Sequence, residues 1–261
     1  RHNMIQTVLT RFFGLNLKRE DDRTAWYLIA EIFWASFLSS AASFNAAFAL
    51  RLGATNADIG LLSSIPALLA ILVSLPAGRI LQNMRNRKPW LLGSLALHRG
   101  AFIFIVLLPF LAGTGLALGP IAVWTLVLIG IPAHFFNIGF TALLADIISE
   151  DRRAAVFSGR QIIYNAAVSL LIFFFGWWLK QAPYPYNYQA MFAFGIVTSF
   201  ISIYFLTKIN IPQLPSHETV QAAKISLKGE LLKIRAALVE TPGFGQIVRN
   251  TFFQSFMLWM A

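Results

Sequence analysis

Long apolar stretches separated by short polar breaks dominate the sequence. A helix needs roughly 20 apolar residues to cross about 30 Å of hydrocarbon. Six stretches reach that length, at 24–50, 59–81, 90–112, 121–145, 156–179 and 189–207. A further apolar stretch begins near Phe244. The pattern predicts an all-α polytopic membrane protein, with a six-helix transmembrane bundle and the truncated start of a seventh span.

Turn residues and amphipathic segments divide the chain further. Breaks rich in Gly or Pro separate consecutive spans, as at 113–120 and 183–188. Apolar residues with helical spacing predict surface helices in the arm and the tail; they are Ile5, Val8, Leu9, Phe12 and Phe13, then Leu227, Leu231, Ile234 and Leu238. We therefore expect a cytoplasmic amphipathic arm (1–23), the bundle (24–208), a cytoplasmic linker with an amphipathic helix (209–243) and a seventh span (244–261).

The composition supports the membrane assignment and excludes several other classes. Hydrophobic residues make up 57% of the 261 residues and charged residues only 12%. Soluble domains carry about 25% charged residues, so this chain lacks the charge to cover a soluble surface. There is no cysteine, which excludes disulfide scaffolds, thiolate metal sites and cysteine nucleophiles.

The positions of the basic residues explain the net charge of +10. Eighteen of the 21 Lys and Arg residues lie in the arm, in the second and fourth breaks and their edges, or in the tail. Arg51 and Lys180 lie in the first and fifth breaks, on the opposite side of the membrane, and Arg99 lies within a span. The positive-inside rule then places the N-terminus and the second and fourth loops in the cytoplasm, and we expect the chain to lie in the cell membrane. The lipid bilayer is the expected partner, and nucleic acid is not needed to explain the charge.

A few polar residues lie inside the predicted spans. Charges there cost a few kcal/mol and are usually paired or face a cavity. We expect Glu31 and Arg99 to pair, directly or through one bridging group. Two roles stay open for them: a structural pair, or a site where Glu31 takes up a proton and releases Arg99. The full set of candidates for a substrate or ion pathway is Glu31, Arg99, His134, Asn137, Tyr164 and Asn165. For the neutral residues, hydrogen bonds between helices are the alternative explanation.

Three sequence segments and the order of the spans resemble the major facilitator superfamily of secondary transporters. The segments are 52–62, 76–88 and 145–153, which are similar to the family's first outer turn, its 2–3 loop and its 4–5 loop. The resemblance implies the N-terminal half of a transporter that works by alternating access on a small-molecule substrate, with a C-terminal bundle as partner and a proton or ion as coupling partner. The acid usual in the 2–3 loop is replaced by Gln82 or Asn83, and its second Gly by Arg85 or Asn86.

The 2–3 loop also predicts a brace at the cytoplasmic side. Gly78 would allow close approach of the backbone. Basic side chains of the loop, Arg85, Arg87 and Lys88, would reach Asp146 at the end of the fourth span. In the resembled family such a pairing holds one conformational state. The alternative is that Arg87 and Lys88 only follow the positive-inside rule.

Two other functions compete with transport. An integral membrane enzyme would need a catalytic constellation, and neither His98 nor His134 has an acid at a catalytic spacing. A six-helix channel or scaffold would be expected to stop after Lys208, before any linker or new span. We expect a transporter rather than an enzyme, with no catalytic residue, no metal site and no cofactor.

Overall fold

The computed structural model describes residues 19–82, 84 and 86–210. The chain divides into two units, Arg1–Pro215 and Ser216–Ala261, and all described residues belong to the first. Most of the expected arm, nearly all of the linker and the whole seventh span lie outside the described residues. The first described helix begins at Glu20, within the expected arm, and the boundary of the arm stays a prediction.

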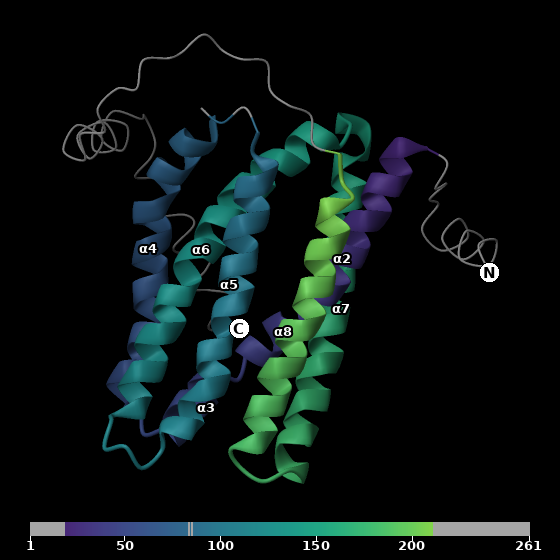
Figure 1. Ribbon diagram of the computed structural model, residues 1–261. Helices are drawn as coiled ribbons and strands as arrows, with labels where there is room; N and C mark the ends of the chain where they lie inside the picture. The colour runs from purple at the N-terminus through teal and green to yellow at the C-terminus, as the bar shows by residue number, and fades with distance from the viewer. Residues whose placement is uncertain (1–18, 83, 85, 211–261) are drawn as a thin grey trace, which may run out of the picture. The chain divides into compact units, whose positions relative to one another are not determined.

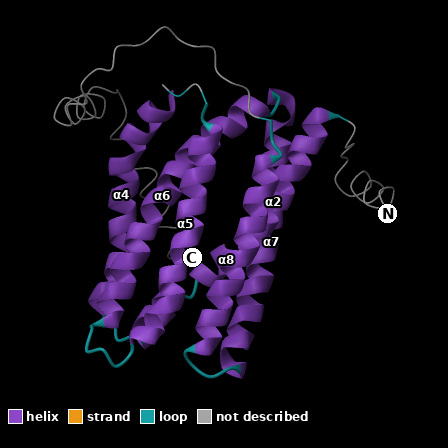
Figure 2. Ribbon diagram, in the orientation of Figure 1, coloured by secondary structure: helices purple, strands orange, loops and turns teal. Residues whose placement is uncertain are grey.

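The described part of the chain is helical and contains no strand (Figure 2). The helices are α2 (Glu20–Ala42), α3 (Asn45–Arg51), α4 (Asn56–Gln82), α5 (Lys88–Leu107), the 3₁₀ turn η1 (Leu108–Leu111), α6 (Leu118–Ile147), α7 (Glu150–Gln181) and α8 (Tyr186–Thr207). This confirms the all-α fold predicted from the hydrophobic pattern.

Among the described residues, five helical segments are long and apolar enough to cross a membrane. They are Glu20–Arg51, Lys88–Leu111, Leu118–Leu144, Glu150–Gln181 and Tyr186–Thr207. The predicted span 59–81 corresponds to α4, whose described apolar part, Asn56–Ala70, is shorter. Five predicted spans are therefore confirmed as long apolar helices, and the total of six with a seventh stays a prediction.

The first predicted span is wrong in one respect, because a turn at Ser43 and Phe44 divides it into α2 and α3. Serine hydroxyls that bond back to carbonyls on the preceding turn bend helices and compete with their backbone bonds. Four serines near the end of α2 make such bonds, and they are Ser36, Ser39, Ser40 and Ser43. This run of small polar residues accounts for the break.

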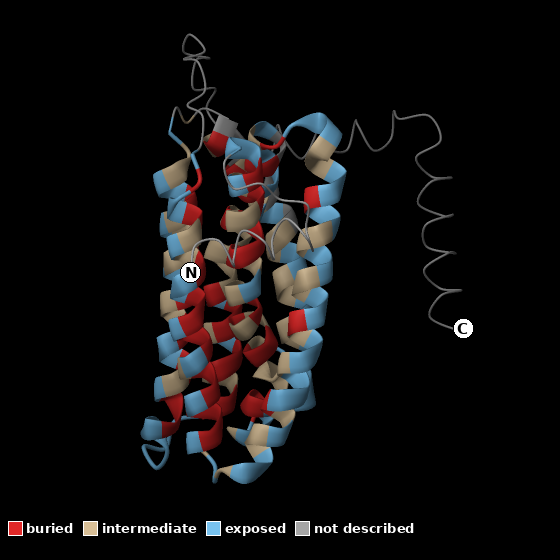
Figure 3. Ribbon diagram, turned by 90° about the vertical axis from the view of Figure 1, so that its right-hand side faces the viewer, coloured by how far each residue is buried: buried red, intermediate tan, exposed pale blue. Residues whose placement is uncertain are grey.

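The helices form two neighbouring groups (Figure 1). Helix α2 packs against α7 and α8, while α6 packs against α4 and α5, and the α5–α8 contact joins the groups. Buried residues face the interior, and the outer surfaces carry exposed ones (Figure 3). Many of the exposed residues are large and apolar, such as Phe173 and Leu170. An outer surface of this kind matches lipid rather than water.

Ion pairs and hydrogen bonds gather the basic residues at one end of the bundle. Arg152 of α7 contacts Asp22 of α2, and Lys88 Nζ donates to the carbonyls of Thr207 and Ile209 at the end of α8. We call this end, formed by the starts of α2, α5 and α7 and the ends of α4, α6 and α8, the basic end. It agrees with the grouping of charge seen in the sequence.

The opposite end is closed by a tight contact between α6 and the turn before α4. A Cβ atom added to Gly119 would lie 2.1 Å from the backbone nitrogen of Ala54. No side chain fits there, so α6 begins against the α3–α4 turn only because residue 119 is glycine. This contact fixes where α4 and α6 start relative to α3.

Candidate functional site

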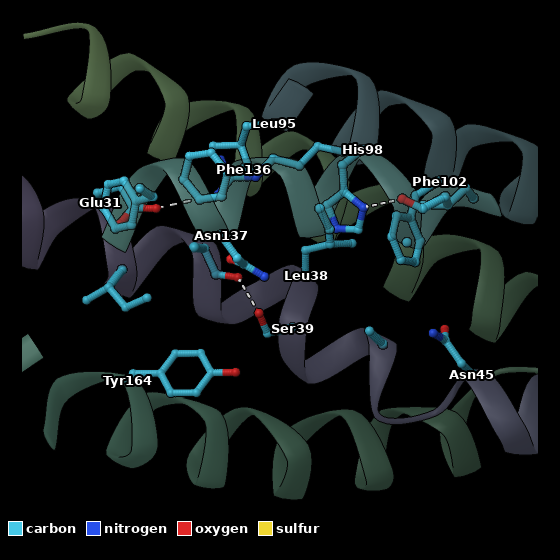
Figure 4. Close-up of a pocket in the computed structure, with 18 of the residues that line it drawn as sticks. Glu31, Leu38, Ser39, Asn45, Leu95, His98, Phe102, Phe136, Asn137 and Tyr164 are labelled. Carbon is cyan, nitrogen blue, oxygen red and sulfur yellow. Dashed lines mark hydrogen bonds and ion pairs between the residues drawn. The ribbon is translucent and has the colours of Figure 1, made fainter. Parts of the chain in front are cut away.

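A cavity of about 490 Å³ lies inside the bundle, between α2 and α3 on one side and α5, α6 and α7 on the others. Apolar walls include Leu38, Phe102 and Phe136 (Figure 4). The polar groups that line it are Glu31, Ser39, Asn45, His98, Arg99, Asn137, Arg160 and Tyr164. A concave, largely apolar space with a few polar groups is the usual form of a small-molecule site.

The only carboxylate among the described lining residues, that of Glu31, binds two guanidinium groups and a hydroxyl. Arg99 Nη2 lies 3.5 Å from Oε1, and Ser202 Oγ donates to the same oxygen at 3.0 Å. Arg160 Nη2 donates to Oε2. We call Glu31, Arg99, Arg160 and Ser202 the Glu31 cluster. Its members come from α2, α5, α7 and α8, so one buried carboxylate joins four helices.

Each arginine of the cluster is also held by a neighbouring helix. Arg99 Nη1 donates to the carbonyl of Ser199 on α8. Arg160 Nε donates to the carbonyl of Leu28 on α2 at 3.2 Å. The Arg160 guanidinium lies over the Phe140 ring, 4.7 Å from its centre, in a cation–π arrangement. These bonds orient both guanidinium groups toward the carboxylate, which reduces the cost of burying them.

Similar positions along three helices explain why the charges meet. Helix α2 begins at Glu20, α5 at Lys88 and α7 at Glu150. Glu31, Arg99 and Arg160 each follow the start of their own helix by about three helical turns. All three helices start at the basic end, so at ~1.5 Å per residue the charges lie about 15–17 Å from it.

The predicted contact between Glu31 and Arg99 is confirmed, but the pair is incomplete without Arg160. From the sequence, Arg160 falls in the first turns of the fifth predicted span, 156–179, and was grouped with the basic residues of the preceding break. Helix α7 in fact begins at Glu150, which carries Arg160 into the interior. The contacts of Arg160 with the Phe140 ring and with Glu31 gave no recognisable signal in the sequence.

The early start of α7 also determines the depth of Asn165 in the bundle. Because α7 begins at Glu150, Asn165 lies about four helical turns from the basic end, roughly one turn beyond Arg160. It is exposed and accepts a hydrogen bond from Gln161 on its own helix at 2.9 Å. His134 of α6 is half-buried and is not among the residues that line the cavity. Neither Asn165 nor His134 is among the residues that line the cavity, and their place in a substrate or ion pathway stays a prediction.

Asn137 and Tyr164 line the cavity, and so does His98 (Figure 4). From the sequence, His98 was considered only as a possible catalytic residue. Nδ1 of His98 lies 2.8 Å from the carbonyl oxygen of Ile129 on α6. A carbonyl can only accept, so Nδ1 carries the proton in this contact and Nε2 is left for other partners. The hydrogen bond fixes the ring between α5 and α6.

The predicted brace is present in part at the basic end. Arg87 Nη1 lies 3.3 Å from Oδ2 of Asp146, and Arg87 Nε donates to the carbonyl of Leu81 at 2.7 Å. Lys88 does not reach Asp146, because its ammonium binds the carbonyls at the end of α8. Arg85 lies outside the described residues.

The role predicted for Gly78 is wrong. It was expected to permit a close approach in the loop, but it lies within α4. A Cβ added there would meet no atom of the described residues within 4 Å. The loop begins only after Gln82, and no described residue makes the close contact with Gly78 that a glycine would serve.

Comparison with protein families identifies the type of protein that holds this site. The sequence pattern of the Major Facilitator Superfamily matches residues 32–261, nearly the whole chain. The chain belongs to the major facilitator superfamily. Comparisons with curated proteins and with solved structures gave no match. Members of the superfamily are transporters rather than enzymes, so this is a multi-pass membrane protein of a transporter family.

Proposed function

We propose that the protein is a secondary active transporter that moves a small solute across the cell membrane by alternating access. The observation that supports this most strongly is the cavity, which holds a buried, ion-paired cluster inside an apolar bundle. Transporters place substrate sites near the middle of the membrane, at the interface of their repeats. Glu31, Arg99, Arg160, Asn137, Tyr164 and His98 are the residues that would meet the solute. A second bundle, supplied by the C-terminal half, would close the path.

Within this proposal the Glu31 cluster has a structural role first. Both carboxylate oxygens of Glu31 are already bound, and each arginine is anchored to a neighbouring helix. The cluster therefore holds the four helices together around the cavity. A coupling proton at Glu31 would have to displace two guanidinium contacts rather than one, so we assign coupling to Glu31 only if its replacement alters the pH dependence of transport.

The Arg87–Asp146 pair has a different role in the proposal. It joins the α4–α5 loop to the end of α6 at the basic end. A contact of this kind adds little stability when it is exposed, but it biases the equilibrium between conformations if it exists in only one of them. We propose that it favours the state in which these helix ends are close together.

The cysteine-free sequence allows a direct test of alternating access. Ser39 lines the cavity, and Leu97 faces outward from α5 with 62% exposure. In the full-length protein, Ser39→Cys should react with impermeant thiol reagents from either side of the membrane, and Leu97→Cys should react from neither. Reaction of Ser39→Cys from one side only, under all conditions that change transport, would contradict alternating access.

The same approach tests the orientation. The positive-inside rule places the basic end in the cytoplasm. We expect Asn86→Cys to resist an impermeant reagent applied from outside, and Asn56→Cys and Tyr186→Cys to react with it. Labelling of Asn86→Cys alone would reverse the proposed topology.

A further inference from the structure

The charges that line the cavity do not balance. Glu31 contributes one negative charge, and Arg99 and Arg160 contribute one positive charge each. Arginine stays protonated in proteins, and the other described lining residues include no further acid or lysine. The described cavity therefore carries a net charge of +1 when His98 is neutral.

An unbalanced charge within the hydrocarbon region costs several kcal/mol unless it is paired or faces water. Both oxygens of Glu31 are already bound by Arg160, Arg99 and Ser202. The carboxylate thus has little capacity left for a cationic solute. A neutral solute would leave the excess charge in place, whereas an anion would neutralise it.

Arg160 is the arginine that an anion can reach. Its side chain is 14% exposed, compared with 5% for Arg99. Nε and Nη2 of Arg160 are bound to Leu28 and Glu31, and no described residue accepts a hydrogen bond from its Nη1. Asn137 and Tyr164 also line the cavity and can donate hydrogen bonds.

We propose that the transported solute is a small organic anion with a single negative charge, of which a monocarboxylate is the simplest example. This rests on the proposed function as a transporter. The anion binds Arg160 through Nη1 while Nη2 stays with Glu31. Its organic part lies against the apolar walls formed by Leu38, Phe102 and Phe136. The volume of about 490 Å³ is in the range of sites for small molecules.

The electrostatic part of the proposal is tested with two thiol reagents of opposite charge and similar size. Ser39 lies about two helical turns beyond Glu31 on α2, or ~12 Å along the helix. We expect Ser39→Cys to react faster with an anionic than with a cationic methanethiosulfonate, relative to Tyr186→Cys as the exposed reference. Adding Arg160→Gln should lower this ratio by about three- to tenfold, and Arg160→Lys should keep it.

The binding part is tested with benzoate, benzamide and benzylamine, which share a shape and differ in charge. Each is added at the same concentration while neutral N-ethylmaleimide labels Ser39→Cys. Benzoate should protect more than benzamide, and benzylamine least, and Arg160→Gln should remove the advantage of benzoate. Equal protection, the reverse order, or no protection from any of the three would overturn the proposal.

The outcomes separate this inference from the proposed function. If Ser39→Cys is labelled from both sides of the membrane but shows no preference for anions, the transporter proposal stands and the anion proposal fails. That result is expected if an acid from elsewhere in the full-length protein neutralises the cavity. If the cavity prefers anions but is open to one side only, alternating access fails and the anion site stands.

Discussion

The Glu31 cluster and the Arg87–Asp146 pair use the same chemistry in two different surroundings. Glu31 is 2% exposed and contacts two arginines and a serine, whereas Asp146 is 45% exposed and contacts one arginine. Breaking a buried ion pair leaves an uncompensated charge, while solvent replaces most of an exposed contact. The comparison indicates that the cluster holds the bundle together and that the pair adjusts its conformation.

Anchoring increases the difference between the two sites. In the cluster, the backbone carbonyls of Ser199 and Leu28 orient the arginines toward Glu31. At the basic end, the carbonyl of Leu81 holds Arg87 in place whether or not Asp146 is charged. The loss of Asp146 therefore leaves Arg87 with a partner and with water, and the loss of Glu31 strands one buried and one partly buried cation.

The largest effect is expected for Glu31→Gln. The amide keeps the shape of the side chain but removes the charge that balances Arg99 and Arg160. We expect the free energy of unfolding to fall by about 3–5 kcal/mol, seen as lower thermal stability in detergent and a lower yield. Asp146→Asn is the matched control, because it makes the same chemical change at the exposed site. Equal losses in the two variants would show that the buried cluster and the exposed pair contribute equally to stability.

A smaller loss is expected for Arg160→Gln. Glu31 keeps Arg99 and Ser202, and water in the cavity reaches position 160, but the ion pair and the ring contact with Phe140 are lost. We expect a decrease of about 2–3 kcal/mol in the free energy of unfolding. In the double variant with Glu31→Gln, one stranded cation is gone. The double variant should therefore be more stable than the sum of the two single losses predicts. Strict additivity would show that the two residues do not interact.

The sequence predicted the fold well and the site only in part. Long apolar runs and the asymmetry of basic residues were sufficient to place most spans, because both follow directly from the chemistry of the bilayer. Glu31 and Arg99 stood out as charges inside apolar runs. Arg160 did not, because it falls in the first turns of the predicted span 156–179 and was grouped with the basic residues of the preceding break, whereas α7 begins six residues earlier, at Glu150. The break after Ala42 depends on serine bonds that hydropathy does not register.

Ser202→Ala measures the contribution of one hydrogen bond in the Glu31 cluster. It removes one neutral donor to Glu31 Oε1 and leaves both arginines. Hydrogen bonds to charged groups contribute about 1.5–3 kcal/mol. Because both arginines stay bound to Glu31 and the cavity left by a hydroxyl is small, we expect the free energy of unfolding to fall by about 1.5–2 kcal/mol, at the lower end of this range. Ser199→Ala is the control, because Ser199 Oγ bonds only to Ile196 of its own helix. If both serines cost the same, the bond of Ser202 to the carboxylate contributes nothing beyond helix packing.

The smallest effect on stability, below about 1 kcal/mol, is expected for Asp146→Asn. An amide oxygen still accepts a hydrogen bond from Arg87, so the variant removes the charge alone. If the pair exists in one state only, its loss shifts the balance between states by as much as the pair contributed to that state. Ser39→Cys labelling reports this shift: labelling from the side of the basic end should become faster, and labelling from the opposite side slower. Arg87→Gln should produce the same shift, because it removes the other half of the pair, and Lys88→Gln should not, because Lys88 binds α8 instead. A change in thermal stability without a change in labelling would make Asp146 a static contact, and the two sites would then differ only in strength.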